Sequence, residues 1–98
     1  MAAYFVACIT VKDPSTYDLY RRDVSAIITR YGGRYLVRGG ATEVKEGSWP
    51  AERTVIIEFS DMATAHAWYF SLEYQAILPL RLNASEGDAI FIEGVSAA

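Results

Sequence analysis

Residues 53–60, RTVIIEFS, are the most strand-like stretch of this chain. β-Branched and aromatic side chains dominate it, and successive side chains of a strand point to opposite faces. One face is therefore wholly apolar, whereas the other is mixed and carries a carboxylate. The apolar face holds Val55, Ile57 and Phe59, and the mixed face holds Thr54, Ile56 and Glu58. The stretch predicts a strand that buries one face.

Three further segments predict strands. Residues 3–11, AYFVACITV, are apolar and β-branched. Their apolar run of about nine residues is too short for a membrane-spanning helix, which needs about 20. Residues 34–44, RYLVRGGATEV, predict a strand that weakens after Gly39 and Gly40, and a turn region follows over 45–52. The last predicted strand is 88–94, DAIFIEG.

Two segments between these strands have the three- and four-residue apolar spacing of amphipathic helices. In the first, Asp13 is the expected N-cap, Pro14 suits the first helical position, and Gly32-Gly33 end the helix. The second spans about 61–72, with Ser60 as its expected cap. The following residues predict a less regular tail, in which Pro79 limits any short helix.

The predicted order of elements is β-α-β-β-α-β. This order is typical of the ferredoxin-like α+β fold, an antiparallel four-stranded sheet with two helices on one face. The length of 98 residues indicates one domain, over 1–98. With 52% hydrophobic and 21% charged residues, the composition excludes a disordered chain.

Strand alternation assigns side chains to the two faces of the predicted sheet. The apolar face should lie under the helices and includes Phe5, Ala7, Ile9, Tyr35, Val37, Ile90 and Ile92. The other face is mixed and should hold Val6, Cys8, Leu36, Ile56 and Phe91 beside Arg38, Glu58 and Glu93. So many exposed apolar groups indicate an interaction surface. We expect a second copy of the sheet to cover it in a two-fold homodimer.

Charge and cysteine content exclude several classes of protein. A net charge of −3, without a run of Lys or Arg, argues against nucleic-acid binding. The single cysteine, Cys8, cannot form an internal disulfide or a paired-cysteine metal site, and it fits a cytoplasmic location. No signal peptide, membrane anchor or nucleotide-binding glycine motif is found in the sequence. We therefore expect no membrane association and no cofactor.

Three motifs in order, YGGRYLVRGG, EGSWPAERTVIIEF and AWYFSLEYQAILPLR, with a later GD pair, cover most of the chain. In these the sequence resembles DUF1330, an uncharacterised bacterial family of the dimeric α/β-barrel superfamily. The resemblance implies a ferredoxin-like protomer and a two-fold dimer, and it implies no assigned reaction. Cys8, where relatives often carry a charge, and Leu72, where they often have Pro, depart from the family pattern.

The resemblance also marks recurring polar and aromatic positions of the family. In this chain they are Arg38, Gly39, Gly40, Trp49, Arg53, Glu58, Trp68, Tyr69, Ser71, Glu73, Tyr74 and Arg81. The glycines of Arg38-Gly39-Gly40 do not form a phosphate-binding motif. They are better explained by a bulge or by a close approach of another group to the backbone.

Arg38 and Glu58 are the candidate catalytic pair, because adjacent strands should place both on the mixed face. Arg38 would anchor a carboxylate or an oxyanion, and Glu58 would act as a general base. The alternative is a structural ion pair that fixes the dimer. Candidate ligand-binding residues are Trp68, Tyr74, Arg81 and Arg53.

Other residue types of chemical interest have simpler explanations. Trp68 has core spacing, whereas Tyr74 could place its phenol at the mouth of a cleft between sheet and helix. His66 lacks metal-ligand spacing and should pack on its helix or lie at the surface. Cys8 is expected to be a small buried hydrophobe, because no activating base can be identified beside it.

Two classes of function stay open at this point. One is a small-molecule-binding protein or cofactor-independent enzyme acting on a small organic acid, and whether it catalyses a reaction is undecided. The other is a non-catalytic dimeric structural or interaction module whose polar groups only fix assembly. A pocket that contains both Arg38 and Glu58 would favour an enzyme.

Overall fold

A computed structural model describes residues 1–50 and 52–96. Ala51, within the predicted turn region 45–52, and residues 97–98 at the end of the predicted domain lie outside the described residues. The elements in chain order are β1 (Ala3–Val11), α1 (Pro14–Arg30), β2 (Arg34–Arg38), β3 (Arg53–Phe59), α2 (Met62–Tyr69), α3 (Leu72–Ala84) and β4 (Ser85–Glu93).

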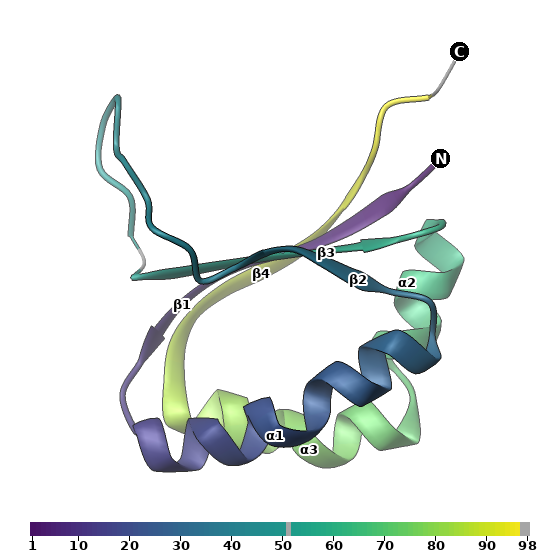
Figure 1. Cartoon of the computed structure of the whole chain (residues 1–98), viewed down its shortest axis with the longest axis horizontal. Helices are drawn as coiled ribbons and strands as arrows, with labels where there is room; N and C mark the ends of the chain where they lie inside the picture. The colour runs from purple at the N-terminus through teal and green to yellow at the C-terminus, as the bar shows by residue number, and fades with distance from the viewer. Residues whose placement is uncertain (51, 97–98) are drawn as a thin grey trace.

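The four strands form one antiparallel sheet in the order β2-β3-β1-β4. Helices α1 and α3 lie side by side beneath one face of this sheet, and α2 lies near one end of it (Figure 1). No helix of residues 1–50 and 52–96 covers the other face. The predicted ferredoxin-like α+β fold is thus confirmed, with a third helix in place of the expected irregular tail.

Helix α1 begins and ends where the sequence predicts. The Asp13 side chain accepts a hydrogen bond from the Thr16 backbone N–H at 3.3 Å, and Pro14 is the first helical residue. At the other end, the Gly33 backbone N–H donates to the Ile28 carbonyl at 3.0 Å, while Gly32 adopts a φ of +76°. These contacts satisfy backbone groups that a bare helix end leaves unpaired.

The segment after β3 differs from the prediction. Asp61, not Ser60, caps α2 by accepting from the Thr64 N–H at 2.7 Å, and α2 already stops at Tyr69. Ser71 then donates to the Trp68 carbonyl at 2.7 Å and accepts from the Tyr74 N–H at 3.1 Å. Ser71 therefore ends one helix and begins the next, a junction that helical periodicity alone does not reveal.

The predicted irregular tail is the regular helix α3. Pro79 lies inside it, where a proline removes one backbone hydrogen bond and usually ends a helix. The helix continues because its inner side packs against α1 and the sheet, burying Tyr74, Leu78 and Arg81. Leu72, predicted at the end of the earlier helix, instead starts α3 and is 90% exposed.

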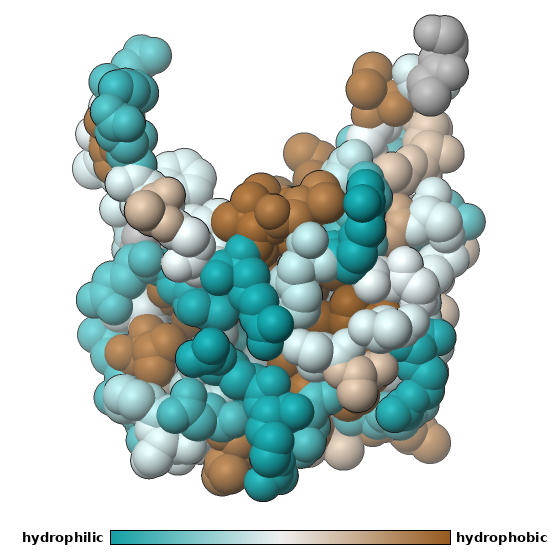
Figure 2. Space-filling model, viewed as in Figure 1, coloured by the Kyte–Doolittle hydropathy of each residue, from teal (hydrophilic) through white to brown (hydrophobic). Residues whose placement is uncertain are grey.

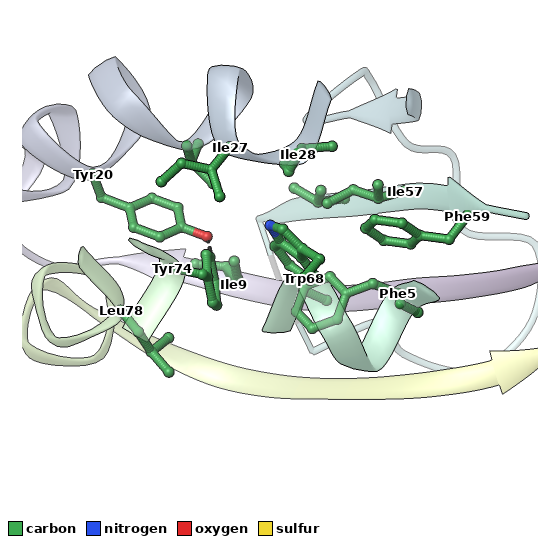
Figure 3. Packing of buried hydrophobic residues seen from close by; sticks show 14 of the residues in the cluster. Phe5, Ile9, Tyr20, Ile27, Ile28, Ile57, Phe59, Trp68, Tyr74 and Leu78 are labelled. Carbon is green, nitrogen blue, oxygen red and sulfur yellow. Dashed lines mark hydrogen bonds between the residues drawn. The ribbon is translucent and has the colours of Figure 1, made fainter. Parts of the chain in front are cut away.

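Trp68 is the centre of the hydrophobic core between sheet and helices (Figure 3). Its side chain is 0% exposed, and its ring stacks on Phe59 with centroids 5.2 Å apart. The ring of Tyr74 lies 4.3 Å from it, and that of Phe5 meets it edge-on at 5.2 Å. Trp68 thus joins two strands to α3.

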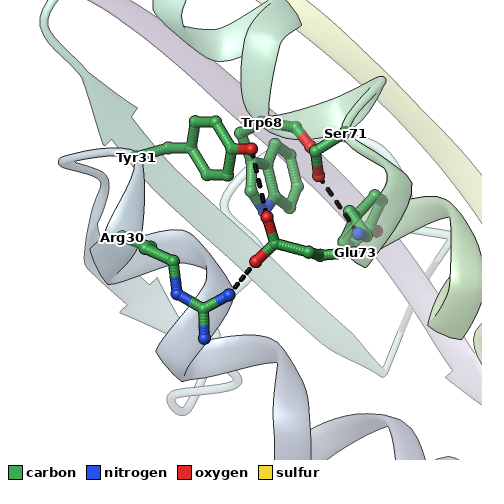
Figure 4. Close-up of polar contacts among 6 residues, drawn as sticks. Arg30, Tyr31, Trp68, Ser71 and Glu73 are labelled. Carbon is green, nitrogen blue, oxygen red and sulfur yellow. Dashed lines mark hydrogen bonds and ion pairs between the residues drawn. The ribbon is translucent and has the colours of Figure 1, made fainter.

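An ion pair ties the end of α1 to the start of α3. Glu73 contacts the Arg30 guanidinium and accepts a hydrogen bond from the Tyr31 phenol at 3.3 Å (Figure 4). The Glu73 carboxylate also lies in the first turn of α3, where the helix dipole favours a negative charge. These contacts explain by structure alone why Glu73 is one of the recurring polar positions of the family.

The predicted faces of the last strand are wrong. Phe91 pairs with Phe5 in the register of β1 and β4, and its ring packs against Phe5 and Tyr69 on the helix side. Ile90 and Ile92 consequently face away from the helices and are 54% and 50% exposed. Glu93 shares the face of Phe91, whereas Ile90 and Ile92 are both apolar, so alternation favoured the wrong set and the pairing with β1 decides which one faces inward.

Residues 39–50 between β2 and β3 project from the sheet on the side opposite the helices (Figure 1). The segment after β4 projects on the same side, and the space-filling view shows a hollow between these two projections, with apolar residues at its floor (Figure 2). We call the helix-free side of the sheet the open face. No helix among the described residues is long and apolar enough to cross a membrane.

Replacing Trp68 with alanine should lower the free energy of unfolding by about 3–5 kcal/mol, because the buried ring would leave a cavity between sheet and helices. Phe70→Ala is the matched control, since Phe70 is 67% exposed. It should change the free energy by less than about 0.5 kcal/mol. Urea unfolding followed by far-ultraviolet circular dichroism measures both, and similar losses in the two variants would contradict the central position of Trp68.

Candidate functional site

A small cavity lies between the sheet and α1 and is lined mainly by apolar, tyrosine and arginine side chains. Its volume of about 20 Å³ is room for about one water molecule. The lining residues are Phe5, Ala7, Ile9, Tyr17, Tyr20, Arg21, Val24, Tyr35, Arg38, Arg53, Val55, Ile57 and Arg81. Within the described part of the chain, no Asp, Glu, His or Cys contributes to this lining.

Arg81 lines the cavity from the last turn of α3 and is only 7% exposed. Its Nε is buried and has no hydrogen-bond partner among the described residues. Burial by itself lowers the pKa of Arg81, but the phenols of Tyr74 and Tyr20 outweigh burial and raise it. Arg81 is therefore a buried, charged guanidinium, and its Nε–H donates no hydrogen bond to the described residues.

Arg53, the first residue of β3, reaches the cavity over the backbone of Gly39. A Cβ atom at Gly39 would lie 2.2 Å from the Arg53 Nη1, and Gly39 adopts a φ of +69°. Only glycine meets both conditions without strain. The predicted close approach at Arg38-Gly39-Gly40 is thus confirmed for Gly39, whereas a Cβ at Gly40 meets no described atom within 4 Å.

Arg38 occupies a different face from the one predicted. A bulge in β2 inserts one extra residue, because Tyr35 pairs with Ile57 while Val37 pairs with Ile56. Beyond the bulge Val37 faces the open side, and Arg38, opposite Val55, turns toward the helices and the cavity. The Arg38 guanidinium carbon lies 4.5 Å from the Tyr35 ring centroid, a cation–π geometry.

Glu58 stays on the open face and does not meet Arg38. It accepts a hydrogen bond from the Arg34 Nε at 2.7 Å and from the Tyr4 phenol at 3.3 Å. The predicted Arg38–Glu58 pair is therefore wrong, both as a catalytic constellation and as an ion pair. The cause is the bulge, which reverses the side-chain alternation of β2 before Arg38.

Two buried tyrosines form a phenol pair behind the cavity (Figure 3). The hydroxyl groups of Tyr20, on α1, and Tyr74, on α3, lie 2.8 Å apart. Burial is the main cause that raises the pKa of each phenol above its ordinary value. Both phenols therefore remain neutral hydrogen-bond donors near Arg81, and Tyr20 is the member of the pair that lines the cavity.

Of the six predicted site residues, the structure brings Arg38, Arg53 and Arg81 to one cavity. Tyr74 lies one residue behind the lining, Trp68 belongs to the core, and Glu58 is on the other face. Sequence reasoning missed Tyr17, Tyr20, Tyr35 and Arg21 as lining residues. Tyr17 and Tyr20 could have been found from the sequence, because tyrosines occupy the inner stripe of α1 and a buried phenol needs a polar partner.

The other residues with reactive or metal-binding side chains that the sequence analysis considered, Cys8 and His66, lie away from the cavity. Cys8, on the open face, is a free and half-buried thiol. His66 is exposed on α2 and contacts the Phe91 ring at 5.2 Å, as its predicted packing role requires. Across residues 1–50 and 52–96, no three His, Cys, Asp or Glu residues are grouped to hold a metal ion.

The fold is shared with several solved proteins. One is the RPA0582 protein of unknown function from Rhodopseudomonas palustris, with 14% identity, 97% of this chain and 83% of that chain covered, and a TM-score of 0.75. SnoaB, a cofactor-independent oxygenase from Streptomyces nogalater, has 12% identity, 98% and 95% coverage, and a TM-score of 0.63. A NIPSNAP domain protein from Burkholderia xenovorans has 18% identity, 100% and 98% coverage, and a TM-score of 0.57.

At such identities the likeness extends to the fold alone. No curated protein matches the sequence. The family model described as a domain of unknown function, DUF1330, matches residues 2–95 and so covers nearly the whole chain. The chain belongs to the DUF1330 family.

Proposed function

We propose that the protein binds a small organic acid in the cavity between the sheet and α1. The observation that carries the proposal is the state of Arg81, a guanidinium that is 7% exposed and whose Nε has no partner among the described residues. A buried charge without an opposite charge beside it is costly to the folded protein. A ligand carboxylate would supply the missing partner, because guanidinium groups bind carboxylates with two parallel hydrogen bonds.

The distribution of ion pairs supports the proposal. Four arginines form ion pairs with carboxylates: Arg21 with Asp18, Arg22 with Asp23, Arg30 with Glu73 and Arg34 with Glu58. Arg38, Arg53 and Arg81 form no ion pair with any described carboxylate, and all three line the cavity. The arginines that lack an internal anion are thus gathered where an external anion could reach them.

Acid–base chemistry is less well supported than binding. The lining described above contains no carboxylate or imidazole that could serve as a general base, and Glu58 lies on the opposite face. A cofactor-independent reaction would draw on the neutral Tyr20 phenol, which can donate a hydrogen bond to developing negative charge. The fold likeness to SnoaB, a cofactor-independent oxygenase, is compatible with such chemistry but carries no residue role.

The open face supports a second proposal, a homodimer formed through the sheet. Leu36, Ile90 and Ile92 are 46%, 54% and 50% exposed there, beside the half-buried Val6 and Ile56. A contiguous apolar surface of this kind usually marks an interface, and a two-fold dimer would bury the same surface on both copies. Dimer formation is compatible with acid binding, because the cavity lies on the helix side of the sheet.

Arg81→Met tests the binding site. Methionine keeps the apolar stem but removes the unpaired charge, so the free variant should unfold at the same or a higher temperature. Succinate or butyrate at about 100 times its dissociation constant should stabilise the unaltered protein by about 2.7 kcal/mol and should not stabilise the variant. Differential scanning fluorimetry measures both effects.

Arg34→Met is the matched control, because it removes an arginine that already has a carboxylate partner on the open face. Its response to organic acids should equal that of the unaltered protein. Acid-induced stabilisation that survives in Arg81→Met, or that is absent from the unaltered protein for every acid in a broad panel, would refute the proposed function.

Ile90→Glu should convert the proposed dimer into monomers, because it places a charge among the exposed apolar side chains of the open face. Size-exclusion chromatography with light scattering measures the mass directly. Leu72→Glu, at a residue 90% exposed on α3, should leave the mass unchanged. A monomeric unaltered protein, or a dimer that persists in Ile90→Glu, would contradict assembly through this face.

A further inference from the structure

The unpaired arginines of the cavity lie on separate aromatic rings. The Arg53 guanidinium carbon lies 5.9 Å from the Tyr17 ring centroid, and that of Arg81 lies 5.9 Å from the Tyr20 centroid. The two tyrosine rings are neighbours on α1, with centroids 5.7 Å apart. The guanidinium groups of Arg53 and Arg81 therefore occupy two separate positions along α1. They do not point to one common site.

One carboxylate cannot balance this arrangement. If it binds Arg81, the buried Nε of Arg53 still lacks a partner among the described residues, and no acidic side chain lines the cavity there. A second anionic group beside Arg53 would supply the partner that its Nε lacks. Arg38, which is exposed and borders the same cavity, can add a third guanidinium at this position.

We infer that the ligand is a small dicarboxylic acid, with one carboxylate on Arg81 and the other on Arg53 and Arg38. This inference rests on the proposed function and specifies its ligand class. The cavity lining also includes apolar side chains, among them Val24, Val55 and Ile57, which suits a short carbon spacer.

A compact dianion such as phosphate fits these observations less well. Its charges are concentrated on one group, whereas the two guanidinium groups lie against different rings. The enclosed volume of about 20 Å³ holds about one water molecule, so the cavity must open further for a ligand of either kind. Binding requires the exposed side chains of Arg21 and Arg38 to move aside, and long surface side chains change rotamer rapidly.

Gly39 is a positioning residue in this inference. A side chain at Gly39 would displace the Arg53 guanidinium, with which its Cβ would collide at 2.2 Å. Gly47 offers a matched comparison, because its φ of +67° is nearly that of Gly39 while a Cβ there meets no described atom within 4 Å. Gly39→Ala and Gly47→Ala therefore carry similar backbone strain, and only the first moves Arg53.

The test compares acids of equal chain length by isothermal titration calorimetry at constant ionic strength. Succinate should bind at least about tenfold more tightly than butyrate, and glutarate more tightly than valerate, because each diacid makes a second charged contact. Arg53→Met should lower diacid affinity to that of the monoacid. Gly39→Ala should weaken diacid binding in the same way, and Gly47→Ala should not.

Each remaining outcome has a distinct meaning. Equal affinity for diacids and monoacids, with loss of both in Arg81→Met, would overturn this inference and leave the proposed function standing. Phosphate or sulfate binding as tightly as the best diacid would overturn it in favour of a compact dianion. If no acid binds, the proposed function itself fails.

Discussion

A single extra residue in β2 determines the composition of the cavity. The bulge at Leu36 reverses the side-chain alternation of the strand, so Arg38 faces the helices and Val37 faces the open side. Without it, Arg38 would stand near Glu58 on the open face, as the uninterrupted pattern predicts. The same hairpin supplies Arg53 at the start of β3, with Gly39 beneath its guanidinium. The cavity thus depends on a local irregularity of one edge strand.

The arginines of the protein fall into two groups. Those on α1 and the open face have carboxylate partners, and the Arg30–Glu73 pair ties α1 to α3. Of the four arginines that line the cavity, only Arg21 has a carboxylate partner among the described residues, and Arg38, Arg53 and Arg81 have none, even though Arg81 is buried. An unpaired buried charge opposes folding, and the proposed ligand would offset that cost at Arg81. Aromatic rings of α1 and the neutral phenol pair provide the surroundings that keep this charge tolerable.

The two faces of the sheet therefore have separate proposed roles. The helix face holds the core around Trp68 and, beside it, the cavity. The open face carries exposed aliphatic side chains and the projecting segment 39–50. That segment begins directly after Arg38, which lines the cavity. Fold likeness to an oxygenase does not bear on either role, since the chemistry depends on side chains that differ between proteins of one fold.

Local patterns in the sequence were enough to predict four strands, their antiparallel ferredoxin-like order, and helix α1 with its Asp13 cap and Gly32 end. They were also enough to predict that Trp68 packs in the core, because periodicity and capping are local properties that neighbouring residues encode. The folded chain alone reveals that Ser71 separates two helices, that α3 continues through Pro79, that Phe91 faces inward, and that Arg38 lies away from Glu58. These features depend on pairing and packing with residues distant in sequence, because the partner strand or helix selects one of several locally possible arrangements.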